Sequence, residues 1–261
     1  MIAFDIERSL FAALIPPGPA HVHAVHTLAL ANDRLTALQA GFWASLPLDY
    51  LLRISGRADL GGMDVSMMPA AEEAHPLVAP LLVRILRLNC QTDSYASLWS
   101  GLFEVGWGDE RWAVDWPNQA PLEGVGPKWV SEITPLRSEF ERRAALVEID
   151  ALVAVWLNLG IEQLIAMLRA RYPILTERED SIWFDALGRK IAADPYTFGV
   201  GQVKGQYERL MKHLSAPGQT AVPDGYAAPF YKADRESEYR QAHAVFSKRL
   251  KDAIDAGWQP S

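Results

Sequence analysis

The sequence predicts a predominantly helical α+β protein, in which a short N-terminal β-hairpin or small sheet precedes a helical, bundle-like portion. Apolar and polar residues alternate within the first 30 residues, which is the period of a strand. Beyond residue 75, apolar residues recur every three or four positions, which is the period of a helix. With 261 residues, 49% of them hydrophobic and 22% charged, the chain can bury a sizeable core.

Residues 1–73 read as a small α/β recognition segment. The apolar run 9–15 ends at Pro16-Pro17-Gly18, and residues 21–30 alternate, so two antiparallel strands joined by this turn are expected. A helix is expected from Asn32 or Asp33 to about Arg53. Pro47 should break or kink it, because proline lacks the amide donor. Residues 63–68 are expected to be extended.

Residues 74–215 read as a helical domain with a tryptophan-rich loop over 105–130. Helices are expected over 76–89 and from residue 93 or 94 to 103. The loop holds Trp107, Trp112, Trp116 and Trp129 among glycines and prolines. A long helix is expected over 134–157, with Thr134 as the N-cap and proline at the first helical position. Two more helices are expected over 161–170 and 202–214.

Residues 216–261 read as a linker followed by a charged C-terminal helix. Two prolines and two glycines within 216–225 are typical of a linker, and the helix is expected over 234–256.

Charge and cysteine content exclude several classes of protein. The net charge of −7 excludes a generally basic nucleic-acid binder, so any nucleic-acid contact must come from a local patch or a positive partner. No run of 18 apolar residues is present, and the N-terminus carries acidic residues where a signal peptide needs basic ones. A single cysteine excludes an internal disulfide. We therefore expect a cytoplasmic protein without a membrane contact.

Catalytic motifs are missing. None of the seven lysines follows an acidic residue by two positions, as common metal-dependent nucleases require. Asp194-Pro195-Tyr196 lacks the second proline of the amino-methyltransferase tetrad, and no phosphate-binding loop or nucleophile elbow occurs. His21, His23 and His26 form a cluster without neighbouring acids, so we expect no metal site. A hydrolase using these histidines stays the least favoured hypothesis.

Several stretches resemble one family. They are residues 42–53 (FWASLPLDYLLR) with the Ser-Gly-Arg turn that follows, 86–90 (LRLNC), 141–153 (ERRAALVEIDALV) and 230–240 (FYKADRESEYR). These stretches are similar to the C-terminal specificity region of large adenine-specific DNA methyltransferases. Such enzymes belong to type IIG restriction–modification systems and to BREX- or DISARM-like phage-defence systems. The resemblance spans most of the chain but only the C-terminal third of such enzymes, and it lacks their cofactor loop and catalytic tetrad.

The resemblance implies target recognition without chemistry. Its partners would be double-stranded DNA and a catalytic methyltransferase domain or subunit, and S-adenosylmethionine would bind that missing catalytic part and not this chain. The expected DNA contacts are all in arginine-containing turns and helices: Arg53, Ser55, Arg57, Arg84, Arg87, Arg142 and Arg143. In the opposing interpretation, Arg53 caps its own helix and Arg57 is merely solvated. The alternative function is a helical protein–protein interaction subunit of a defence complex, with the tryptophan-rich loop as its contact surface.

Overall fold

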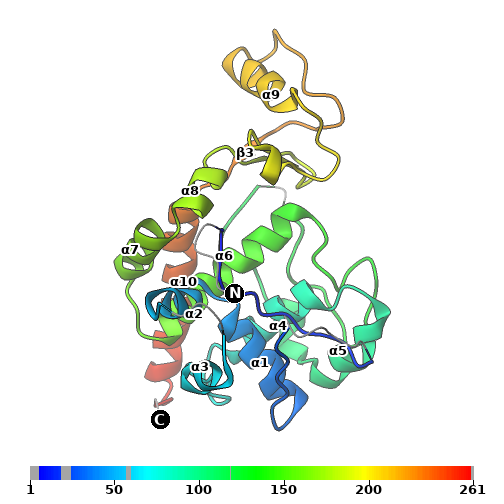
Figure 1. Ribbon diagram of the computed structural model, residues 1–261. Helices are drawn as coiled ribbons and strands as arrows, with labels where there is room; N and C mark the ends of the chain where they lie inside the picture. Colours follow the sequence, from blue (N-terminus) through cyan, green and yellow to red (C-terminus); the bar gives the residue numbers. More distant parts are fainter. Residues whose placement is uncertain (1–5, 19–24, 57–59, 118, 260–261) are drawn as a thin grey trace.

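The chain folds around one long, almost wholly buried helix (Figure 1). A computed structural model describes residues 6–18, 25–56, 60–117 and 119–259. About half of the chain is helical. The elements, in chain order, are α1 (Asp33–Trp43), α2 (Leu46–Ile54), α3 (Gly62–Met67), α4 (Val78–Asn89), η1 (Asp93–Tyr95), α5 (Ala96–Leu102), η2 (Val105–Asp109), α6 (Glu139–Trp156), α7 (Ile161–Arg171), α8 (Pro173–Glu179), β1 (Trp183–Phe184), β2 (Lys190–Ile191), η3 (Pro195–Thr197), α9 (Gln206–Ser215), β3 (Tyr231–Lys232) and α10 (Arg235–Asp255).

Helix α6 is the centre of the body because residues 144–155 are apolar apart from Glu148 and Asp150, which are also buried. Residues 144, 145, 147, 149 and 151–155 are all buried, which is typical of a helix enclosed by other helices. Helix α10 packs along it, and α4, α2 and α7 cover its remaining faces. The main core draws residues from most of the chain, including Leu38 of α1, Leu152 of α6 and Phe246 of α10.

The mostly helical fold is confirmed, but the N-terminal hairpin is wrong. The described residues form one sheet, a three-stranded antiparallel sheet of order β2-β1-β3, and it lies in the second half of the chain. Residues 9–15 form neither a helix nor a strand, and three of their amides bind side chains instead of a second strand. Ser9 N and Leu10 N donate to the Asp49 carboxylate, and Leu14 N donates to Asn89 Oδ1 over 2.9 Å.

Several helix boundaries also differ from the prediction. The helix expected over 32–53 is divided between Trp43 and Leu46, just before Pro47, which lies in the first turn of α2. Residues 63–68 fall mainly in the short helix α3 and not in an extended segment. Helix α6 begins after Ser138 and not after Thr134, because Ser138 and Glu141 form a reciprocal capping box.

The second half of the chain contains a lobe, defined here as residues 183–232, that projects from one end of the helical body (Figure 1). The three strands form its base, and α9 lies at its far end. A small second core of five buried residues attaches the base of the lobe to the body: Phe140, Ile182, Phe184, Ala192 and Ala233. This core places the lobe directly over the start of α6.

Candidate functional site

Arg53 is in the interior of the body and not on a DNA-facing surface. It is 6% exposed. Its Nε donates to Asp49 Oδ2 over 3.0 Å, while Nη1 and Nη2 donate to the carbonyls of Arg171 and Ile6 over 2.8 and 2.9 Å. The guanidinium also lies 4.4 Å from the centre of the Tyr172 ring. Every nitrogen of the guanidinium has an internal partner, so Arg53 fastens α2 to α7 and to the N-terminal segment.

The segment after α2 contains two of the residues predicted to contact DNA, Ser55 and Arg57. Ser55 is exposed, and its hydroxyl donates to the Leu52 carbonyl over 2.7 Å at the end of its own helix. Arg57 lies outside the described residues. Of the two predicted contacts that the structure describes here, Arg53 is buried and Ser55 is exposed, with its hydroxyl in a local hydrogen bond.

Arg84 and Arg87 on α4 are also buried. Arg84 donates to Glu148 over 2.7 Å and to Glu110 over 2.9 Å. Burial opposes the charge of Arg84, but these carboxylates outweigh it and hold its pKa above the ordinary value. Arg87 donates to the carbonyls of Thr134, Leu122 and Ile133. Burial among these uncharged acceptors lowers the pKa of Arg87 to about 10. Both arginines tie α4 to the segment before α6, which explains why they are present without any ligand.

The tryptophan-rich loop over 105–130 is packed onto the body and is not a free contact surface. Trp107 is 1% exposed, and Trp112, Trp116 and Trp129 are partly buried against the core clusters. The indole of Trp129 donates to the Cys90 carbonyl over 2.8 Å. These aromatic side chains thus stabilise an irregular segment by burial.

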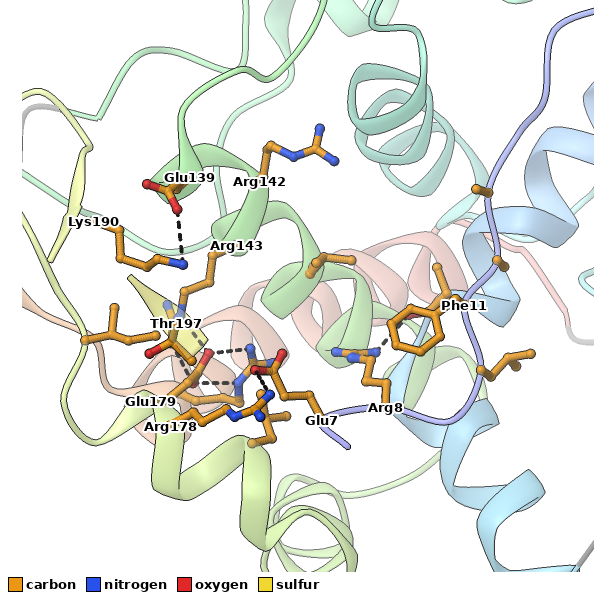
Figure 2. A pocket seen from close by; sticks show the side chains of 18 of the residues that line it. Glu7, Arg8, Phe11, Glu139, Arg142, Arg143, Arg178, Glu179, Lys190 and Thr197 are labelled. Atoms are coloured by element: carbon orange, nitrogen blue, oxygen red, sulfur yellow. Dashed lines mark hydrogen bonds and ion pairs between the residues drawn. The ribbon is translucent and has the colours of Figure 1, made fainter. Parts of the chain in front are cut away.

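A cavity of about 420 Å³ lies between the N-terminal segment, α6, α8 and the base of the lobe (Figure 2). Leucine, alanine and phenylalanine side chains make up much of its wall. Its charged lining has twice as many cations as acids: Arg8, Arg142, Arg143, Arg178, Lys190 and Arg235 against Glu7, Glu139 and Glu179. The excess positive charge contrasts with the −7 of the whole chain.

Three of these six cations, Arg8, Arg143 and Arg235, are neutralised by a buried network. Glu179 accepts two hydrogen bonds from Arg143, over 2.9 and 3.0 Å, and two from Arg235, over 2.8 and 2.7 Å. Asp150 accepts from Arg8, Arg235 and Tyr239. Burial opposes ionisation of Glu179, but Arg143 and Arg235 outweigh it and hold its pKa well below the ordinary value. Arg143, one of the predicted DNA contacts, is therefore a structural residue.

Arg142 is the cavity cation whose described partners are all uncharged. Its Nη1 donates to the carbonyls of Leu88 and Leu136 over 3.1 and 3.3 Å. Its side chain points away from the Glu179 network (Figure 2), and burial lowers its pKa. Of the seven residues predicted to contact DNA, Arg142 and Ser55 retain a partly or fully exposed side chain in the described structure.

The lobe has a local excess of positive charge that the net charge of the whole chain conceals. It has six Lys and Arg against four Asp and Glu, and it contains four of the seven lysines of the chain. Lys190 pairs with Glu139 over 3.1 Å. Lys204, Lys212 and Lys232 are exposed, and among the described residues none of their ammonium groups has an ion-pair partner. Counting charge in windows along the sequence, and not over the whole chain, could have found this signal.

One acid of the lobe, Asp185, is buried and adds no negative charge to its surface. The Asp185 side chain is fully buried, where it accepts from the amides of Leu187, Arg189 and Ala227 and from the Arg189 guanidinium. It therefore shows no negative charge to solvent. Asp224 is exposed and pairs with Arg209 over 3.1 Å. The lobe therefore presents three exposed ammonium groups without an ion-pair partner in the described structure, against one exposed carboxylate without such a partner, that of Glu208 on α9.

Within the described ranges, no cluster of His, Cys, Asp and Glu is arranged to hold a metal ion; His21 and His23 lie outside those ranges. None of the helices there has the length and apolar character needed to cross a membrane. No protein family, curated protein or solved structure matches this chain. The function must therefore be argued from the surface itself.

Proposed function

We propose that this chain is a DNA target-recognition part of an adenine-specific DNA methyltransferase system, and that it contacts the phosphates of the duplex through the lobe. The chain itself would not be catalytic, and S-adenosylmethionine would bind the catalytic partner. The observation that carries the proposal is the concentration of unpaired lysines on a projecting lobe of an otherwise acidic molecule. Lysine ammonium groups bind DNA phosphates by releasing counterions, which requires no complementary sequence.

The location of the charge also fits this function. A cationic lobe that projects from the body can reach a duplex while the acidic remainder stays at a distance. The remaining acidic surface would keep binding weak and dependent on a partner, as the resemblance to methyltransferase specificity regions implies.

The test is the salt dependence of binding to a fluorescent random-sequence duplex. We expect micromolar or weaker affinity that falls as salt rises. The variant K204E/K212E/K232E should lower the magnitude of the slope of log K against log salt by about 3, since each phosphate contact contributes about 0.9. The matched control K128E/K248E/K251E changes the net charge equally and reverses the three lysines that lie outside the lobe. Equal effects of the two triple variants would contradict the proposal.

One observation favours the alternative function, a protein–protein interaction subunit. Phe11 and Ile15 lie on the extended N-terminal segment and are 74% and 50% exposed, and exposed apolar side chains are common at interfaces. A chain that binds no DNA at low salt, but forms a stable complex with a co-expressed methyltransferase subunit, would support this alternative.

A further inference from the structure

The loop between β2 and α9 exposes apolar side chains at the surface of the lobe. Tyr196 is 88% exposed, Val200 is 87% exposed and Val203 is 59% exposed. These are among the most exposed large hydrophobic side chains of the described chain. No other part of the described structure covers these side chains, so they contribute little to folding. A contact with another molecule is the simplest explanation for exposed apolar side chains at these positions.

The backbone of this loop is fixed. Gly199 lies so close to β2 that a Cβ there would be 1.9 Å from the Lys190 carbonyl oxygen, so no other residue fits. The Gln202 side chain accepts from the amides of Ala192 and Gly199, each over 3.0 Å, and donates to the Ala192 carbonyl over 2.6 Å. The Val200 amide donates to Glu139 Oε2 over 3.1 Å. The exposed side chains are thus held on a preorganised loop, which lowers the entropic cost of binding.

The charges around the loop match a nucleic acid. Lys204 lies in this loop, two residues before α9 begins, and is exposed. The two neighbouring carboxylates are already engaged: Asp194 accepts from the Tyr196 amide over 2.9 Å, and Glu139 pairs with Lys190. An exposed aromatic ring and an unpaired ammonium group on one loop are the combination that binds bases and phosphates together.

We propose that this loop binds an unstacked base of DNA, with the Tyr196 ring stacked on the base and Val200 occupying the opened step of the duplex. The inference rests on the proposed function, because it needs the lobe to lie on DNA. An adenine methyltransferase must remove its target base from the stack, which leaves a gap and an unpaired base on the opposite strand. Apolar side chains of proteins are known to enter such opened steps, and aromatic stacking tolerates any base.

The experiment compares two fluorescent duplexes that differ by one position, one fully paired and one with a single mismatch that weakens stacking. The wild-type chain should bind the mismatched duplex about tenfold more tightly, since stacking on one base is worth about one factor of ten or more. Tyr196→Ala and Val200→Ala should each reduce this preference at least about threefold, whereas Tyr196→Phe, which keeps the ring, should retain it. Leu187→Ala is the control, because Leu187 is a 66% exposed apolar residue of the same lobe outside the loop.

The outcomes separate this inference from the proposed function. Binding that depends on the lobe lysines, but with the same preference in wild type and Tyr196→Ala, would overturn the role of the loop and leave the proposed function standing. Equal binding of both duplexes by the wild type would also overturn it. Absence of binding to either duplex would overturn both. Circular dichroism melting of each variant excludes unfolding as a cause, because these side chains are exposed and their removal should not lower stability.

Discussion

Glu179 accepts four hydrogen bonds from two arginines of the cavity network, and its replacement tests whether these buried arginines are structural. In Glu179→Gln, the charge between Arg143 and Arg235 is lost, while the geometry of the side chain is nearly unchanged. Four hydrogen bonds between 2.7 and 3.0 Å now reach the carboxylate. An amide accepts through its oxygen alone, and its NH₂ group faces guanidinium donors. Since the Glu179 side chain is only 11% exposed, we expect a loss of about 3–5 kcal/mol in the free energy of unfolding.

The assay is urea unfolding at several pH values, followed by circular dichroism. Because the pKa of folded Glu179 is well below its ordinary value, its stabilisation is fully present above the unfolded pKa of about 4.3 and is lost as pH falls toward the folded pKa. The difference between wild type and Glu179→Gln should thus be constant from neutral pH to about pH 5 and shrink below that. Glu177→Gln, an exposed neighbour on α8, should change stability by less than about 0.5 kcal/mol. A difference below about 1 kcal/mol for Glu179→Gln at neutral pH would refute the reasoning.

Three further predictions follow from buried groups. Burial lowers the pKa of His75 to about 4, and its Nδ1 accepts from the Leu77 amide. The free energy of unfolding should therefore be highest above about pH 6.5 and fall by about 2–3 kcal/mol as pH drops toward 4. In His75→Gln, this pH-dependent loss should be absent. Burial raises the pKa of the Cys90 thiol to about 12, so a thiol reagent at pH 8 should modify the unfolded chain at once and leave the native chain unmodified. Arg84→Ala should destabilise by about 3–5 kcal/mol, measured by urea unfolding, because it leaves Glu148 buried without its cation.

The long helices could be predicted because their signals are local. In α7, Leu164, Ile165 and Leu168 fall on one buried face at helical spacing. The start of α6 was harder to predict, since both Thr134 and Ser138 can cap a helix. Ser138 is used because Glu141 completes the capping box, while the Thr134 hydroxyl accepts from the Val130 amide over 2.8 Å.

The sheet could not be predicted from periodicity. Each strand has two residues, such as Trp183–Phe184 in β1, and an alternation over two positions carries no information. The N-terminal segment shows the opposite case. Its apolar run over residues 9–15 is typical of a strand, but the amide of Leu10 binds the side chain of Asp49, which is distant in sequence, in place of a second strand.

The arginines show most clearly why a DNA contact could not be assigned from the sequence. A guanidinium that contacts phosphate and one that binds a buried carboxylate look the same in sequence, and the partner decides between them. For Arg143 the partners Glu179 and Glu238 are 36 and 95 residues away. Arg53 gave a clue, because Asp49 lies one helical turn before it. The excess of lysines in the lobe could have been found from the sequence alone, by counting charge within residues 183–232.

The most direct test of the account is to find which part of the chain touches DNA. Ultraviolet cross-linking to a bromodeoxyuridine-substituted duplex at low salt, followed by mass spectrometry of the cross-linked peptides, gives this answer. We predict cross-links within residues 183–232, with Tyr196 among them, and a loss of those cross-links in K204E/K212E/K232E. Cross-links confined to the helical body, or none at all, would contradict the assignment of the lobe as the DNA-binding surface.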